Sequence, residues 1–428
     1  MKRYAASLLA LGLVCAVPAA ANAQKDNKYT KEASKFIGLA MARPDAEARK
    51  PLYEQALAQL QQGMATKDSL NAKLYLLAGQ ALVGLNQFLA ADSAFDKAAA
   101  LHPPYAEEIG GEREQGWILA FNVGADLMNQ GKLPEAIAML EQAQVVYAER
   151  PEGLMNLGAL YSNQGDLDKA ATAFVDARKA IKGPLAEKLD SAGKAQWARF
   201  DDMAQINLSQ LEGQRGVNAF QAKDFAAASV AFKKARALNP YSRDYVFNLS
   251  QAIWAQASAI EAKLDSLPEA QKAAAKKQAA AELIALYEAL DTVAGGVLGI
   301  DPTNELVYVI MARSHRMIGE YSGDPAKLAS AQVETVRLLE EREKLPVELS
   351  EIMVSANEGV ATVRGSLKNR NLAVGGTTAV KFTLYGIDGR VLGEQVINIT
   401  VPEKEQTGSF EGTIPVTGEI AGWRYALN

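Results

Sequence analysis

The sequence predicts a mainly α-helical protein, an α-solenoid of helical hairpins followed by a small antiparallel β-sandwich. Two observations carry this expectation. Small and apolar residues recur in the same order, at a nearly fixed spacing, between residues 75 and 240. After Pro346 the pattern changes to the alternation of β-branched and polar residues that is typical of strands.

The clearest copy of the helical pattern lies between residues 154 and 177. Its first half reads L-x-x-L-G-x-x-Y and its second half reads A-x-x-x-F-x-x-A, with Gly158 and Ala170 at the small positions. Small residues let two helices cross closely, while the Leu and aromatic positions fill the space between hairpins. Gly165 between the two halves suits the left-handed end of a helix. We therefore expect a helix, a tight turn and a second helix.

This pattern resembles the tetratricopeptide repeat (TPR), a helix–turn–helix unit of 34 residues. Ala136 and Ala170 are separated by 34 residues, whereas longer spacings elsewhere indicate insertions near 104–114 and 182–205. We expect a half-formed hairpin before residue 75. Further copies start near Tyr75, Val123 and Gly216, and degenerate ones start near Val246 and Tyr308. The resemblance implies a stack of hairpins that holds other proteins on its inner face and rarely performs chemistry.

The first 23 residues read as a secretory signal peptide. Lys2 and Arg3 precede an apolar run, and Ala21 to Ala23 fits a small-x-small cleavage site before Gln24. An uncleaved membrane anchor is the alternative, but Pro18 interrupts a run that is already short. We therefore expect a bacterial protein that is periplasmic or secreted, with no integral membrane segment after cleavage.

The remaining chain offers little for catalysis. Cleavage would remove the one Cys, Cys15, and would move the formal net charge from −5 to −7 by removing Lys2 and Arg3. This acidic balance argues against a general nucleic-acid role. The two histidines, His102 and His315, stand far apart, and no motif for a zinc protease, a phosphate loop or a serine hydrolase is present. The sequence predicts no enzyme activity, no metal site and no cofactor.

The histidines leave two readings open. His102 falls at a helix end, where it would cap the helix or lie on the surface. His315 lies beside Arg313 and Arg316, which form either a small anion-binding patch or arginines paired with glutamates such as Glu305 and Glu320. The sequence favours the paired arrangement.

Leu345 and Pro346 end the last predicted helix, so we expect a helical domain over 24–345 and a β-sandwich over 346–428. The expected strands are Glu348–Ser355, Ala361–Leu367, Ala379–Gly386, Leu392–Val401, Gly408–Pro415 and Trp423–Leu427. Phe382-Thr383-Leu384-Tyr385, followed by Asp388-Gly389, resembles the FxLYD type of bacterial immunoglobulin-like domain, although Gly386 stands where that family has Asp. This resemblance implies a module that packs, spaces or adheres.

In the TPR family the first helix of each hairpin lines the inner face, and this resemblance implies a groove. When the family's inner-face positions are carried over to this chain, they also include Gln251 and Val309. The residues that we assign to the groove are Phe121, Met128, Met155, Asn163, Phe220, Phe247, Trp254 and Arg313. Phe, Trp and Met are typical interface anchors, but the same side chains could be core. The sequence thus predicts an exported scaffold that binds a protein or peptide in the bacterial envelope. The alternative is an accessory protein that binds a small molecule or a cell-wall glycan.

Overall fold

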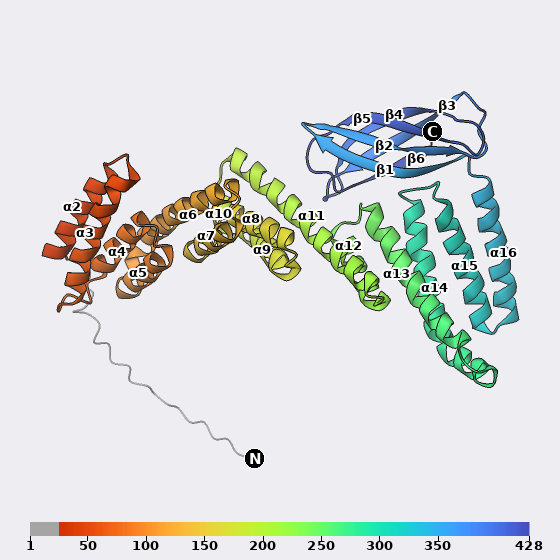
Figure 1. The fold of residues 1–428 in the computed structure, drawn as a ribbon, viewed down its shortest axis with the longest axis horizontal. Helices are drawn as coiled ribbons and strands as arrows, with labels where there is room; N and C mark the ends of the chain where they lie inside the picture. Colours follow the sequence, from red (N-terminus) through yellow and green to blue (C-terminus); the bar gives the residue numbers. More distant parts are fainter. Residues whose placement is uncertain (1–24, 428) are drawn as a thin grey trace, which may run out of the picture. The chain divides into compact units, whose positions relative to one another are not determined.

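The computed structural model describes residues 25–427. The predicted signal peptide, residues 1–23, lies outside the described residues. Figure 1 shows successive helical hairpins followed by the strands of a small β domain. The predicted fold class, TPR-like helical hairpins followed by a small antiparallel β-sandwich, is confirmed.

The helices pair along the chain as hairpins, except for two short connecting helices. They are α2 (Lys28–Met41), α3 (Ala46–Met64), α4 (Ala72–Gly84), α5 (Phe88–Leu101), the 3-10 helix η1 (Pro103–Tyr105), α6 (Ala106–Asn129), α7 (Leu133–Val146), α8 (Pro151–Gln164), α9 (Leu167–Ile181), α10 (Leu185–Lys188), α11 (Ser191–Gln221), α12 (Phe225–Leu238), α13 (Arg243–Asp265), α14 (Glu269–Leu298), α15 (Glu305–Ser322) and α16 (Pro325–Glu343).

The described chain separates into two compact units. The first comprises the described residues up to Leu160 together with Lys182–Glu187, and the second comprises Tyr161–Ile181 and the rest of the described chain from Lys188. The second unit therefore contains both the later helices and all the strands. Helix α16 ends at Glu343 and the first strand begins at Val347, while the domain limits 24–345 and 346–428 remain a prediction.

Four hairpins share one turn geometry. A residue with positive φ follows the first helix in each: Asn86 at 58°, Gly131 at 73°, Gly165 at 78° and Lys223 at 61°. In each turn the next residue's N–H donates to a carbonyl five residues earlier, over 2.9 to 3.0 Å, as from Lys132 to Leu127. This hydrogen bond closes the last turn of the helix and reverses the chain. These four hairpins are the ones whose motifs are complete in the sequence.

The small residues of the motif stand where paired helices approach most closely. A Cβ on Gly79 would lie 2.2 Å from the Phe95 ring, and a Cβ on Gly216 would lie 2.6 Å from the Phe232 ring. Any side chain at either position would overlap the opposing ring. The small residues of the motif thus mark the positions at which the two helices of one hairpin are in contact.

One expectation about the helical part needs correction. The segment before Tyr75 is a complete hairpin, α2 and α3, whose first helix starts with a capping box between Asn27 and Thr30. The inserted segments are also largely helical: α6 reaches 24 residues and α11 reaches 31. The insertions mainly lengthen the first helix of a hairpin, because they consist largely of residues with good helix propensity.

Six strands form two antiparallel three-stranded sheets. They are β1 (Val347–Asn357), β2 (Val360–Asn369), β3 (Thr377–Tyr385), β4 (Val391–Thr400), β5 (Thr407–Pro415) and β6 (Gly422–Leu427). The sheet orders are β1-β2-β5 and β4-β3-β6. Alternate side chains of both sheets, including Val363, Phe382, Leu384 and Ile414, form a buried core. The predicted strands are all present, because alternation specifies which face of each strand is buried.

Within the second unit the β-sandwich contacts the helices through a buried polar cluster. The Tyr425 hydroxyl hydrogen-bonds to Asp301 Oδ1 at 2.5 Å and to Thr303 Oγ1 at 2.6 Å. Arg243 pairs with Asp301 Oδ2 at 2.8 Å. Burial, followed by the Asp301 carboxylate, raises the pKa of Tyr425 well above its ordinary value. We call this contact, together with that of Tyr241 below, the seam.

Tyr241 forms the other part of the seam. Its ring stacks on Tyr385 of β3 with centroids 5.3 Å apart and an interplanar angle of 13°. A Cβ on Gly422 would lie 1.9 Å from the Tyr241 carbonyl oxygen, and one on Gly389 would lie 2.2 Å from the Tyr241 hydroxyl. The Asn239 side-chain amide donates to the Ala421 carbonyl at 2.7 Å. The sandwich therefore contacts the segment between α12 and α13 backbone to backbone.

Candidate partner-binding site

An apolar hollow lies on the first helices of three successive hairpins in the second unit. Its volume is about 420 Å³. Helices α11, α13 and α15 supply its lining, which consists of Phe220, Gln251, Trp254, Ala255, Ser258, Leu306 and Ile310. The structure therefore brings Phe220 and Trp254, two of the predicted groove residues, into one concave surface.

Packing fixes the two aromatic rings of the hollow. Phe220 meets Phe225 edge to face, with centroids 5.2 Å apart. Both Phe220 and Trp254 are half-buried and pack against a core that includes Leu249 and Ile253. Rings that are held on one side and open on the other lose little conformational entropy when a partner covers them. This is the arrangement expected of interface anchors.

A closed ionic network lies beside Trp254. The Arg313 guanidinium carbon is 5.9 Å from the centre of the Trp254 ring, and Arg313 Nη2 is 2.7 Å from Glu261 Oε2. The hydroxyls of Tyr287 and Tyr321 donate to Glu261 Oε1 at 2.8 and 3.2 Å. Burial raises the pKa of Tyr287 to about 12. Arg313 is thus neutralised, and this network supplies no free charge to the hollow.

The charged side chains around His315 are also paired with one another. His315 Nε2 is 3.2 Å from Asp291 Oδ1, and Arg316 Nε is 3.8 Å from Glu320 Oε1. Glu305, one of the partners named from the sequence, instead pairs with Arg370 of the β-sandwich at 2.8 Å. The arginines beside His315 are therefore paired with carboxylates, which is the arrangement that the sequence favours. Glu305, however, pairs with the β-sandwich and not with these arginines.

The other predicted groove residues are not part of the hollow. Phe247 is half-buried with the Arg243 guanidinium 5.1 Å from its ring centre, and Asn163 is exposed near the end of α8. Phe121, Met128 and Met155 belong to the first unit. Phe121 stacks on Trp117 with centroids 4.9 Å apart, and Met155 is only 8% exposed, so it lies within the core of its unit. The assignment of these residues to partner binding stays a prediction.

Sequence reasoning missed the contribution of α15. Leu306 and Ile310 line the hollow, whereas the sequence pointed to Val309 and Arg313 on that helix. The degenerate motif near Tyr308 lacks the glycine that sets the register in the other hairpins. The signal available in the sequence was the apolar pair Leu306 and Ile310, which stand four residues apart and therefore on one face of the helix.

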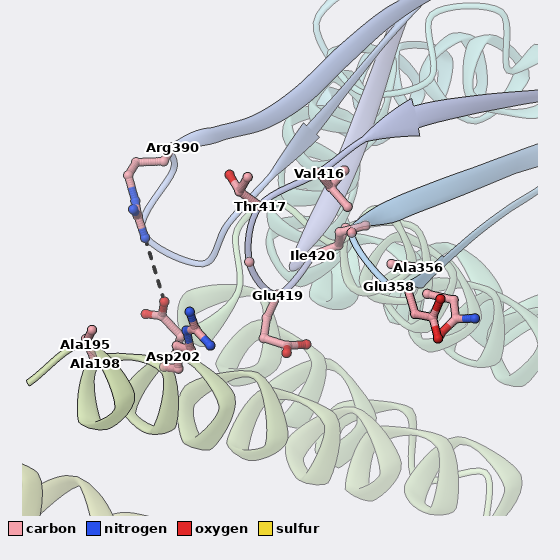
Figure 2. A pocket seen from close by; sticks show the side chains of 14 residues that line it. Ala195, Ala198, Asp202, Ala356, Glu358, Arg390, Val416, Thr417, Glu419 and Ile420 are labelled. Atoms are coloured by element: carbon pink, nitrogen blue, oxygen red, sulfur yellow. Dashed lines mark ion pairs between the residues drawn. The ribbon is translucent and has the colours of Figure 1, made fainter. Parts of the chain in front are cut away.

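Another cavity of the second unit is of a different kind. It measures about 750 Å³ and lies between α11 and the loops at one end of the β-sandwich. Figure 2 shows Arg390 reaching toward Asp202, and the two ionic groups are 3.9 Å apart. Burial raises the pKa of Asp202, with Asp388 as a further cause. Glu358 and Glu419 face the same space, so the cavity carries charges of both signs and lacks anchoring aromatic rings.

No helix among residues 25–427 is long and apolar enough to cross a membrane. In the same part of the chain, no group of three or more His, Cys, Asp and Glu side chains is placed to hold a metal ion.

Comparison with solved structures finds other helical-repeat proteins at low similarity. The crystal structure of MamA shares 14% identity, with a TM-score of 0.26, over 55% of this chain and 96% of the other. The TPR domain of P58(IPK) shares 14%, with a TM-score of 0.24, over 74% and 96%. YrrB, described as a TPR protein with an unusual peptide-binding site, shares 13%, with a TM-score of 0.23, over 53% and 91%. No protein-family model and no curated protein matches the sequence.

Proposed function

We propose that this chain is a non-enzymatic scaffold that holds a protein or peptide partner in the envelope of a bacterium. The observation that carries the proposal is the apolar hollow in which Phe220 and Trp254 stand together on the first helices of successive hairpins. Interface anchors are enriched in such aromatic residues, and a central one contributes about 2 kcal/mol or more to binding.

The size of the hollow indicates how a partner would engage it. A volume of about 420 Å³ accommodates one or two large apolar side chains of an extended or helical segment. Gln251 and Ser258 stand among the apolar lining residues and offer hydrogen bonds to the backbone of that segment. Because the neighbouring Arg313 is paired with Glu261, shape and apolar contact would select the partner more than charge.

Export and the β domain belong to the same proposal. The basic start, apolar run and small-x-small site of residues 1–23 support removal of a signal peptide and a periplasmic or secreted location. The Phe382 to Tyr385 motif supports an FxLYD-like immunoglobulin module. Such a module would present or space the helical part without taking part in chemistry.

The test is site-specific photocrosslinking in the native host. A photoreactive residue replacing Gln251 should capture a discrete partner, whereas one replacing the exposed Ala273 of α14 should not. Adding Leu306→Ala or Trp254→Ala should reduce capture about tenfold or more, as expected for loss of an anchor. Val333→Ala is the matched control, because it truncates an apolar side chain of α16 that is 71% exposed.

Circular dichroism separates the two possible causes of reduced capture. If Trp254→Ala and Leu306→Ala lower the unfolding temperature while capture per folded molecule is unchanged, the side chains are core and the proposal fails. Leu306 matters most here, because its 42% exposure leaves it a small role in stability.

A further inference from the structure

A smaller cavity at the seam concentrates positive charge. It measures about 200 Å³ and is lined by Arg236 from the last turn of α12 and by Arg424 from β6. No Asp or Glu is among its lining residues. Two cationic groups therefore share one cavity in a chain whose formal net charge is −5.

The two arginines also lack a carboxylate partner. Among the described residues 25–427, no Asp or Glu pairs with either guanidinium, and neither side chain forms a hydrogen bond. Other arginines of the same unit do have carboxylate partners: Arg178 at 2.6 Å, and Arg243 and Arg370 at 2.8 Å. A guanidinium has five N–H donors and cannot lose its charge. The donors of Arg236 and Arg424 are thus available to a ligand.

Aromatic packing presets the orientation of Arg424. Its guanidinium carbon lies 4.4 Å from the centre of the Tyr385 ring, and that ring in turn stacks on Tyr241. A ring covers one face of a guanidinium and leaves its N–H edge available, which is the geometry that a planar carboxylate accepts with two parallel hydrogen bonds.

Gly296, which has no side chain, leaves space for the Arg236 guanidinium. A Cβ on Gly296 would lie 3.4 Å from Arg236 Nη2, so the guanidinium rests against the final turns of α14. The carbonyl end of a helix carries negative partial charge. This negative end opposes a doubly charged phosphate more strongly than an anion with a single charge. The walls formed by Tyr385 and Trp423 suit an apolar or aromatic group attached to that anion.

We infer that the seam cavity binds a small organic carboxylate, whose two oxygens are held by Arg236 and Arg424 and whose body contacts Tyr385 and Trp423. The hollow around Phe220 and Trp254 shares no lining residue with this cavity. The inference therefore goes beyond the proposed function and does not depend on it.

Calorimetric titration of the full chain with benzoate tests this site. Benzoate should bind, whereas benzamide, which has the same shape without the charge, should bind at least tenfold more weakly. Arg236→Gln and Arg424→Gln should each weaken benzoate binding about tenfold or more, because each removes charge-assisted hydrogen bonds. Lys277→Gln, which removes an exposed positive charge of α14 outside the cavity, should leave it unchanged.

Further arms address folding and the source of the carboxylate. Arg424→Lys keeps the charge but not the planar fork, so intermediate binding is expected, and its position on the surface of β6 spares the fold. A short peptide with a C-terminal Phe carboxylate, compared with benzoate, distinguishes a chain end from a free acid, and binding of either supports the inference. No benzoate binding, equal binding of benzamide, equal weakening by Lys277→Gln, or displacement of benzoate by inorganic phosphate at equal concentration would overturn it.

Discussion

Single residues decide whether the β-sandwich can rest on the helices. Gly422 contacts the Tyr241 backbone so closely that no side chain fits there, and a Cβ on Gly389 would overlap the Tyr241 hydroxyl. Asp301, only 1% exposed, receives hydrogen bonds from Tyr425 and Arg243. Removing one member of such a cluster leaves another buried without its partner, which costs more than the hydrogen bond contributes.

Gly422→Ala should destabilise the second unit by about 1–3 kcal/mol or more, because its Cβ would overlap the Tyr241 carbonyl and force the strand away. Chemical denaturation followed by circular dichroism measures this change. Gly376→Ala is the control, since the nearest atom to its Cβ would be 3.7 Å away. Equal midpoints for the two variants would mean that the seam adjusts freely.

At the scale of elements, the repeated turns explain why so much of the fold is readable from the sequence. Gly131 and Gly165 mark their turns directly, and alternation marks the strands. The α2/α3 hairpin was underestimated because Pro51 lies inside α3 and interrupts the expected pattern. Phe220 and Trp254, two residues named from the sequence, lie in the hollow, while their role in partner binding stays a prediction. The seam was not predicted, because contacts between residues more than 120 positions apart, such as Thr303 and Tyr425, leave no periodic signal.

The turns also predict opposite effects of two substitutions. Gly165→Ala should cost about 1 kcal/mol, because an L-residue is strained at a φ of 78°. Lys223→Gly should instead stabilise the protein by up to about 1 kcal/mol, because Lys223 already adopts a φ of 61° at an exposed position. Thermal unfolding of both variants measures the difference, and a shift of the same sign in both would contradict the strain argument.

At the scale of the molecule, the later helices and the β-sandwich belong to one compact unit. The exposed Lys344 lies at the change from helix to strand, where we expect mild trypsin to cut first and leave a helical and a β-rich fragment. Because the seam includes Tyr241, Asp301 and Tyr425, the two fragments should remain associated in size-exclusion chromatography until denaturant is added. Preferred cuts within 120–240, with 340–350 resistant, would place the boundary elsewhere.

The buried phenol of Tyr425 gives the seam an ultraviolet absorbance signal that depends on pH. Its pKa, like that of Tyr287, is raised by burial, whereas a tyrosine in the unfolded chain ionises near pH 10. The stability that these phenols contribute is fully present below about pH 10 and is lost as the pH rises toward the folded-state values. In an alkaline titration followed by tyrosinate absorbance at 295 nm, exposed tyrosines should ionise first, and a late, cooperative rise in absorbance should accompany unfolding. Tyr425→Phe should reduce the amplitude of that late rise. Tyrosinate absorbance therefore reports, without any added label, whether the β-sandwich still contacts the helices.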